Sequence, residues 1–236
     1  MNTILHKAET RGHANHGWLD SHHTFSFAHY YDSLRVSFGA LRVLNDDIVQ
    51  GGRGFGKHPH DNMEIVSIPL QGALAHSDTT GKSETIKTGD VQIMSAGSGL
   101  AHAEFNASAT EPVNFLQIWV FPKLRNIAPR YEQKSFNRAD RLNTFQTVVA
   151  PDDAQAVHIN QDAWFSMIDL TPGNNATYTI KRKGNGVYIF VIEGSVLAGE
   201  QVLNKRDGLG VSGIEQVKLV ASADAQVLLI EVPMNV

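Results

Sequence analysis

The stretch GGRGFGKHPHDNMEIVSIPLQG (51–72) decides the fold, because it joins a glycine-rich turn and a His-Pro-His triplet to an apolar run. Residues i and i+2 of a β-strand point to the same face, so His58 and His60 would present two imidazoles in one direction. Pro59 lies between them and cannot donate a hydrogen bond within a sheet. We therefore expect this segment to form the start of a strand or an edge strand.

A second segment, GSGLAHAEF (97–105), repeats the same spacing with His102 and Glu104 after another glycine-rich turn. An isolated His-x-His pair is more often two surface histidines than a metal site. Two such pairs inside one barrel would bring three imidazoles and a carboxylate together. This donor set suits a redox-capable divalent metal and leaves room for a substrate or O2. The sequence therefore predicts a metal site formed by His58, His60, His102 and Glu104.

The composition indicates a globular protein and excludes several classes of function. The chain has 236 residues, a formal net charge of −4 and no cysteine, so disulfides, thiolate metal sites and cysteine nucleophiles are excluded. It has no long basic run, and no apolar run approaches the ~18 residues that a membrane span needs. The N-terminus lacks the apolar stretch of a signal peptide. We expect a soluble cytoplasmic protein that binds neither nucleic acid nor membranes.

Many short apolar runs predict an all-β fold of the sandwich or barrel type. The runs are rich in Val, Ile and Phe and are bounded by Gly, Asp, Asn or Pro, as is typical of strands. Helical periodicity is scarce, and only RADRLNTFQ (138–146) predicts a short helix. A weak internal repeat supports two barrels, because 64–74 followed by 88–99 resembles 186–196 followed by 205–213.

The repeat divides the chain into three predicted parts. These are an N-terminal metal-binding barrel over 1–125, a packed linker over 126–160 and a C-terminal barrel over 161–236. The linker is rich in proline and polar residues. No histidine follows His158, so only the first barrel carries the two pairs. We therefore expect one barrel with a metal and one without.

The two histidine segments resemble the two motifs of the cupin superfamily, which would span residues 52–72 and 89–102. Ser95 stands where a proline is usual, and His102 is displaced toward the C-terminus. These departures, together with Glu104, are similar to the pirin branch of the superfamily. The resemblance to pirins covers most of the chain, in RGHANHGWLDSHHTFSFAHYYD (11–32), LRVLNDD (41–47), GFGKHPHDNMEI (54–65), MSAGSGLAHAEFN (94–106), QIWVFP (117–122) and PRYEQKSF (129–136).

The resemblance implies an all-β bicupin, in which two jelly-roll barrels pack together and the N-terminal barrel holds one iron-type centre. It carries the ligand positions over to His58, His60, His102 and Glu104, and it leaves Glu64 in a supporting or structural role. Fe(II) is the leading metal. Three nitrogen donors and one oxygen donor also tolerate Ni, Cu, Zn, Co or Mn.

The sequence is close to bacterial pirin-like proteins with quercetin 2,3-dioxygenase activity. The implied reaction is ring opening of a flavonol, or of a related enolic or phenolic compound, with O2. A metal acting as a Lewis acid lowers the pKa of the flavonol 3-hydroxyl. Glu104 is the hypothesised catalytic base that takes its proton.

Two other functions stay open at this point. Some pirins resemble redox-responsive regulators that bind protein partners through a metal-tuned surface, which is a non-enzymatic alternative. The other is a structural protein that resembles seed-storage cupins. The predicted ligand set argues against it, because a purely structural barrel needs no convergent histidines and glutamate. An apolar pocket that opens onto the metal would favour catalysis, and a closed site would favour regulation.

The N-terminal segment is rich in histidine, with His13, His16, His22, His23 and His29. The spacing of His13 and His16 fits a helix and makes a second metal site a minor alternative. Hydrogen-bonding or lid roles are the main interpretation of these side chains. Trp18, Phe25 and Phe27 are interpreted as residues that cover a face of the barrel.

Overall fold

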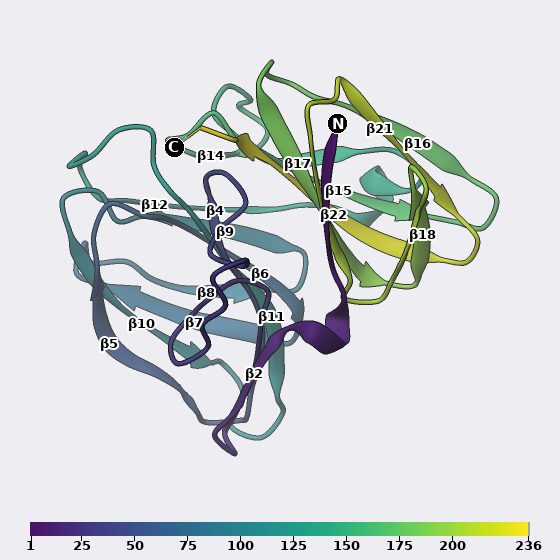
Figure 1. Cartoon of the computed structure of the whole chain (residues 1–236). Helices are drawn as coiled ribbons and strands as arrows, with labels where there is room; N and C mark the ends of the chain where they lie inside the picture. Colours follow the sequence, from purple (N-terminus) through teal and green to yellow (C-terminus); the bar gives the residue numbers. More distant parts are fainter. Residues whose placement is uncertain (236) are drawn as a thin grey trace.

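The computed structural model describes residues 1–235 as an all-β protein (Figure 1). In the N-terminal half, a seven-stranded sheet of order β12-β9-β6-β11-β4-β3-β2 packs against a four-stranded sheet of order β5-β10-β7-β8. The strands are β2 (Gly12–Asn15), β3 (Leu19–His23), β4 (Leu41–Val49), β5 (Gly54–His60), β6 (Glu64–Gln71), β7 (Ala73–Asp78), β8 (Ser83–Lys87), β9 (Asp90–Ser95), β10 (Leu100–Asn106), β11 (Val113–Val120) and β12 (Arg130–Ser135).

The C-terminal half has the same two-sheet construction. Its sheets have the orders β1-β20-β17-β22-β15-β13-β14 and β16-β21-β18-β19. The strands are β1 (Asn2–His6), β13 (Gln146–Ala150), β14 (Val157–His158), β15 (Trp164–Leu170), β16 (Asn175–Thr179), β17 (Asn185–Glu193), β18 (Ser195–Ala198), β19 (Gln201–Asn204), β20 (Gly208–Ser212), β21 (Gln216–Ala221) and β22 (Ala225–Pro233). The order β9-β6-β11-β4 in one half matches β20-β17-β22-β15 in the other, which confirms the predicted repeat.

Several strands pair outside the boundaries that the sequence predicts. The first strand, β1, pairs with β20 in the C-terminal sheet. Figure 1 shows this purple N-terminal segment beside the C-terminal half. Strand β12, from the expected linker, pairs with β9 in the N-terminal sheet, and β13 belongs to the C-terminal sheet. The division of the chain at residues 125 and 160 therefore stays a prediction. The strands of the two sheets pair across these boundaries.

The predicted helix over 138–146 was wrong in its length. Apart from η1 (Ala8–Thr10), the described residues contain only η2 (Arg138–Arg141), a single 3₁₀ turn capped by the side chain of Asn137. Asn143 has a positive φ of 54°, a left-handed conformation that no helix continues through. The chain then enters β13. Nothing in the described part of the chain has the length and apolar character of a membrane-spanning helix.

The two seven-stranded sheets face each other across one shared apolar core. This core draws buried side chains from both halves, for example Leu116 and Ile118 on β11 with Phe165 on β15 and Leu228 on β22. A continuous core of this kind makes the two halves depend on each other for stability. We therefore expect them to unfold together.

Replacing Phe165 with alanine is expected to destabilise both halves at once. Phe165 is fully buried in the shared core, and such a truncation costs about 3–5 kcal/mol. Leu197→Ala, on the exposed side of β18, is the matched control and should change stability little. Urea unfolding followed by tryptophan fluorescence and by far-UV circular dichroism should give one coincident transition, shifted to lower urea. Two separate transitions, with one half unshifted, would contradict the shared core.

His6 is expected to make the protein less stable in acid. Burial, aided by Arg35, lowers the pKa of His6 from 6.5 to about 4, and its Nδ1 pairs with the Tyr188 hydroxyl at 2.9 Å. The unfolded chain therefore binds the proton at a higher pH than the folded chain does. The free energy of unfolding falls as the pH drops from about 6.5 to about 4, by up to about 3 kcal/mol from this group.

The variant His6→Asn keeps a polar partner for Tyr188 but cannot titrate in this range. The urea midpoints of the wild type and the variant are measured at about pH 7 and about pH 4.5. The fall of the midpoint between the two pH values gives the acid-induced loss of stability of each protein. The acid-induced loss of stability should be smaller in the variant, because position 6 no longer takes up a proton. Some loss should remain, because the other buried histidines are unchanged. Equal losses in the two proteins would exclude His6 as a contributor.

The interiors of the two halves differ. Seventeen buried apolar side chains, from Ile168 to Leu229, fill the space between the C-terminal sheets. Between the N-terminal sheets the apolar clusters are small, for example the one that contains Leu74, Ile86 and Phe115. The remaining space of the N-terminal barrel is a cavity with polar residues on its walls.

Candidate metal centre and cavity

Strands β5 and β10 position the three predicted histidine ligands. β5 is the edge strand of its sheet, so Pro59 interrupts no interior ladder, and the expected edge position is confirmed. His58 lies directly opposite His102 in the register, and His60 lies opposite Leu100. The register shifts between His102 and Glu104, and a bulge of this kind can re-aim side chains near a site.

The structure brings the imidazoles of His58, His60 and His102 together. One ring nitrogen from each lies within 4.8 Å of the other two. The ring centroids are 4.5 Å apart for His58 and His102 and 4.9 Å apart for the other two pairs. The two segments lie some 40 residues apart in sequence, and pairing of β5 with β10 makes the convergence possible.

The hydrogen bonds of these rings fit a metal site. The Nδ1 of His58 donates to the carbonyl of Gly56 at 2.8 Å, because a carbonyl can only accept, and this leaves its Nε2 as a lone-pair donor. His102 is only 2 % exposed, and neither ring nitrogen has a hydrogen-bond partner within residues 1–235. An unpaired buried polar group costs about 1–3 kcal/mol. A bound cation would satisfy one of the two ring nitrogens of His102.

The rings of His60 and His102 are also in the protonation state that a metal needs. Burial, followed by the nearby His58, His60 and His76, lowers the pKa of His102 to about 3. Burial and His58 lower the pKa of His60 to about 4. These imidazoles are therefore neutral near pH 7, so their nitrogens can bind a cation without first losing a proton.

Glu104 lies on β10 beside His102 and is buried. Its Oε2 accepts from the Gln117 amide at 2.8 Å, and its Oε1 accepts from the Ser67 hydroxyl at 3.2 Å. Burial raises the pKa of Glu104, while His76 and these two hydrogen bonds oppose the rise. One of its oxygens lies within 4.8 Å of ring nitrogens of His76 and His102. Its role as the fourth ligand stays a prediction.

His76 is a residue of this site that the sequence analysis missed. It lies on β7 directly opposite Glu104, is buried, and pairs through Nε2 with Asp78 at 3.0 Å. The signal was available, because ALAHSD (73–78) contains a His-x-Asp pair with the same i, i+2 spacing as the other two pairs. Its place behind Glu104 and His102 suits a residue that orients ligands.

Glu64 lies away from the imidazoles, as expected of a structural group. Its Oε2 accepts from the Ser95 hydroxyl at 2.8 Å and from the backbone N–H of Asn160 at 3.1 Å. Burial raises its pKa, and these hydrogen bonds oppose the rise. Glu64 therefore ties β6 to β9 and to the segment that precedes β15.

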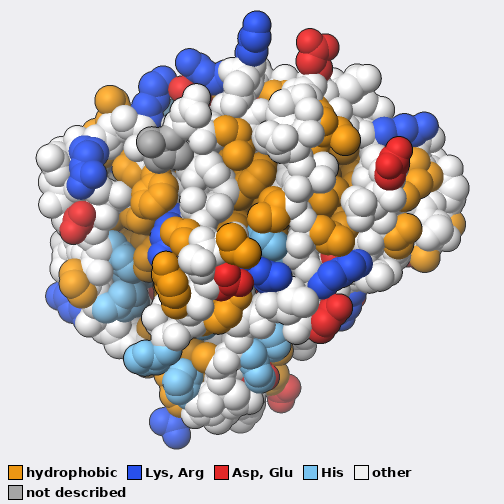
Figure 2. All heavy atoms as spheres, in the orientation of Figure 1, with side chains coloured by type: hydrophobic (Ala, Val, Ile, Leu, Met, Phe, Trp, Pro, Cys, Tyr) orange, Lys and Arg blue, Asp and Glu red, His pale blue; other side chains and the backbone are white. Residues whose placement is uncertain are grey.

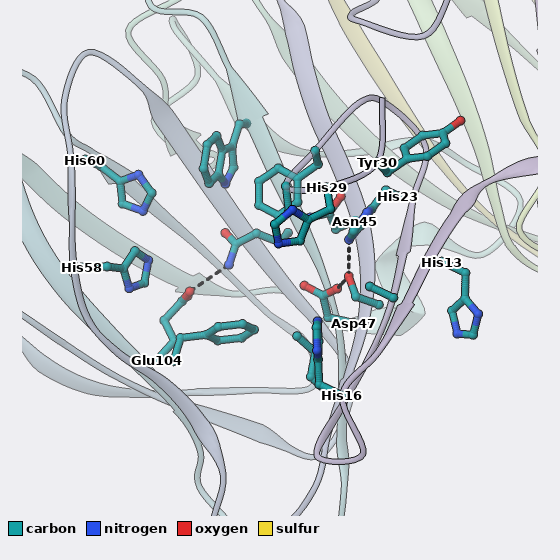
Figure 3. A pocket seen from close by; sticks show the side chains of 18 of the residues that line it. His13, His16, His23, His29, Tyr30, Asn45, Asp47, His58, His60 and Glu104 are labelled. Atoms are coloured by element: carbon teal, nitrogen blue, oxygen red, sulfur yellow. Dashed lines mark hydrogen bonds between the residues drawn. The ribbon is translucent and has the colours of Figure 1, made fainter. Parts of the chain in front are cut away.

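A cavity of about 600 Å³ opens onto the three imidazoles (Figure 3). His58, His60 and Glu104 lie at one side of it, and its other walls combine apolar and aromatic side chains with polar ones. Trp119 packs edge-on against His60, with ring centroids 4.9 Å apart, and Phe27 packs edge-on against Trp119. The volume and the lining match those of typical small-molecule sites.

The N-terminal histidines do not form the helical pair that their spacing suggests. His13 lies on strand β2, opposite His22 on β3, and both rings approach Asp20, which accepts from the Nε2 of His13 at 2.7 Å. These three side chains are partly exposed. His16 lines the cavity, and so do His13, His23 and His29. Figure 2 shows histidine side chains gathered over the N-terminal half of the molecule, at the bottom and lower left of the view.

The aromatic residues of this segment pack as the sequence suggests. Phe25 is buried in the shared core, and Trp18 packs against Phe55 with ring centroids 5.4 Å apart. Phe27 forms part of the cavity wall. The sequence predicted that it covers a face of the barrel but did not predict that it borders a cavity.

Comparison with known proteins then places the chain in a family. A family model described as Pirin matches residues 5–120, and one described as Quercetinase C-terminal cupin domain matches residues 147–232. The quercetin 2,3-dioxygenase of Escherichia coli strain K12 is 41% identical over 230 residues, which are 97% of this chain and 98% of that protein. The chain belongs to the pirin family. The family resemblance drawn from the sequence is thus confirmed.

Solved structures place this pirin in the same fold. The crystal structure of the bacterial pirin YhhW from E. coli, in complex with nickel(II), matches with a TM-score of 0.93 and 40% identity, over 98% of this chain and 99% of that chain. A putative quercetin 2,3-dioxygenase of Pseudomonas aeruginosa is 42% identical over 94% of this pirin and 95% of its own length. The predicted all-β bicupin is therefore confirmed. Hazelnut vicilin, at 13% identity and a TM-score of 0.69, shares the fold alone.

Proposed function

We propose that this pirin is a metal-dependent dioxygenase of the quercetin 2,3-dioxygenase type. Its substrate would be a flavonol, or a related enolic or phenolic compound, whose ring is opened with O2. The cavity that opens onto His58, His60 and His102 is the observation that carries the proposal. Relatives at about 40% identity that bear this enzyme's name support it.

The three imidazoles and Glu104 would hold one divalent metal, with Fe(II) as the proposed ion. Nickel(II) in the related E. coli crystal structure is consistent with the tolerance of such a donor set for Ni, Cu, Zn, Co or Mn. When bound, the metal would supply Lewis acidity that lowers the pKa of the flavonol 3-hydroxyl.

Glu104 would accept the proton of that hydroxyl. Ser67 and Gln117 hold one oxygen each, so the carboxylate has a fixed orientation beside His102. Burial raises its pKa, which brings the base closer to the pH at which a base is most effective. Leu19, Phe27 and Trp119 line the same cavity and would exclude water from the flat rings of the substrate.

The cavity also favours catalysis over the regulatory alternative. A protein that only senses the state of its metal needs no space beside the ligands. Here a volume of about 600 Å³, enough for a multi-ring aromatic compound, adjoins them. A non-enzymatic regulator that binds protein partners is therefore the second candidate.

The test is anaerobic reconstitution with Fe(II), followed by addition of quercetin and O2. O2 uptake and loss of flavonol absorbance should occur together with the wild-type protein. His60→Ala, which removes one ligand, is the negative control. If neither a flavonol nor another enolic substrate is consumed by fully metallated protein, the regulatory function takes the place of this proposal.

A further inference from the structure

Two of the sequence segments that resemble pirins supply no metal ligand, yet they meet on one wall of the cavity. The segment 11–32 provides Ser21 and His23 on β3, and the segment 41–47 provides Asn45 and Asp47 on β4. Ser21 lies directly opposite Asp47 in the register, and His23 lies opposite Asn45. All four side chains therefore project from the same face of the seven-stranded sheet, and all four line the cavity.

These residues form a directed chain of hydrogen bonds (Figure 3). The Ser21 hydroxyl donates to Oδ1 of Asp47, and the Nε2 of His23 lies 2.8 Å from the Ser21 oxygen. Since the serine has given its hydrogen to Asp47, its oxygen accepts from an Nε2–H of His23. Burial lowers the pKa of His23 to about 4, so the ring is neutral and keeps this one donor. The chain thus orients the Asp47 carboxyl group.

Asp47 itself has spare hydrogen-bonding capacity toward the cavity. Its side chain is only 4 % exposed, and within residues 1–235 its Oδ2 has no hydrogen-bond or ion-pair partner. The neighbouring Asp46 takes the nearby cations, because Arg11 and Arg206 pair with it at 3.4 and 2.9 Å. In Figure 3 the Asp47 carboxyl group lies among the residues that surround the cavity, on the opposing sheet from His58 and His60.

The surroundings of Asp47 determine which ligand groups can form a hydrogen bond with its carboxyl group. Burial raises the pKa of Asp47 to about 7, and the charges of Asp46 and Glu104 add to the rise, whereas the bond from Ser21 opposes it. An anionic ligand group would be repelled by these carboxylates. A neutral hydroxyl can donate to the ionised carboxylate and can also accept from the protonated acid. A phenolic hydroxyl, which has a pKa near 10 in tyrosine, is neutral at pH 7.

We propose that Asp47 is a specificity-determining residue that binds a hydroxyl group on a part of the substrate away from the metal ligands. Ser21 and His23 are positioning residues that hold the carboxyl group in place. The inference rests on the proposed function and narrows it, because it selects polyphenols with a hydroxylated outer ring over flavonols that bear only the reacting hydroxyl.

Binding under anaerobic conditions tests this role without requiring turnover. The probes are quercetin, which has hydroxyls on both outer rings, and 3-hydroxyflavone, which has only the reacting one. Dissociation constants are measured by fluorescence quenching on metal-loaded protein. Wild type should bind quercetin about tenfold or more tightly than 3-hydroxyflavone, as expected for one hydrogen bond to a charged group. Asp47→Ala should lose most of this preference and retain affinity for 3-hydroxyflavone.

Two further variants separate the role from a general loss of structure. Ser21→Ala should reduce the preference only in part, because it frees Asp47 without removing it. Glu64→Gln, which alters a buried carboxylate of the same sheet that binds Ser95 and Asn160 and does not line the cavity, should leave the preference unchanged. Metal content and melting temperature are compared for every variant, so that a folding defect is recognised.

The possible outcomes are distinct. A wild-type preference that persists in Asp47→Ala overturns the proposal, and so does a wild-type protein that binds both flavonols equally. If turnover is observed, the effect should appear in KM for quercetin, and a fall in kcat with unchanged KM would contradict a binding role. Failure of the enzyme proposal alone would appear as absence of O2 uptake while the binding preference remains.

Discussion

Replacing His102 with alanine is expected to abolish metal binding and flavonol turnover together. His102 lies opposite His58 in the sheet and belongs to two of the three groups of ligand atoms that lie within 4.8 Å of one another. Loss of residues that merely support ligands costs 10–100-fold in metal affinity, so loss of this ligand should cost more than about 100-fold. Metal per chain, measured by mass spectrometry after desalting, and O2 uptake are the readouts.

The control for His102→Ala is His76→Asn. His76 is an equally buried histidine on the neighbouring strand, paired with Asp78. As a supporting residue it should weaken metal binding by no more than about 100-fold, and the protein should still reach full occupancy at excess metal. The His102 ring has no hydrogen-bond partner among the described residues, so its removal should not unfold the metal-free protein. Full metal occupancy in His102→Ala would contradict the assigned ligand set.

Replacing Glu104 with glutamine is expected to lower turnover about 10²–10⁴-fold while much of the metal remains bound. The substitution keeps the shape of the side chain but removes the base. It also disturbs the local hydrogen bonds, because Ser67 and Gln117 both donate to this carboxylate and an amide NH2 cannot accept from them. Rates are measured with quercetin at saturating O2 and divided by the measured metal content.

Glu64→Gln is the matched control for Glu104→Gln. Glu64 is a second buried glutamate of the same barrel, but it binds Ser95 and Asn160 instead of facing the imidazoles. Its replacement should cost stability and leave the rate per bound metal nearly unchanged. Undiminished turnover of Glu104→Gln at full metal occupancy would rule out Glu104 as the base.

Much of the fold and the histidine cluster could be predicted because both are local patterns in the sequence. Alternating apolar runs define strands, and the i, i+2 spacing of His58 with His60 and of His102 with Glu104 sets which way each pair points. Pro59 placed its strand at a sheet edge for a similarly local reason.

The features that could not be predicted depend on which distant strands pair. The crossing of β1 into the C-terminal sheet and the return of β12 to the N-terminal sheet leave no periodic signal in their own residues. The same holds for the core that the two large sheets share. The role of Asp47 depends on the strand opposite it, where it faces Ser21. His76 differs, because its i, i+2 pair with Asp78 was visible in the sequence and was overlooked.

The difference between the two barrels follows from how their interiors are filled. In the C-terminal barrel, apolar side chains such as Tyr178, Ile189 and Leu219 occupy the space between the sheets. In the N-terminal barrel, polar groups on β3, β4, β5 and β10 replace part of that core and border a cavity. The apolar core between the two halves stabilises the N-terminal barrel, whose own interior has fewer buried apolar side chains.

Anomalous diffraction from crystals grown anaerobically with Fe(II) tests the central claim most directly. The account predicts one peak about 2 Å from a ring nitrogen of His58, His60 and His102 and from an oxygen of Glu104, close to the distances that such ligands adopt around zinc. A peak at the His13, Asp20 and His22 group instead, or Glu104 lying away from the ion, would contradict the four-ligand centre.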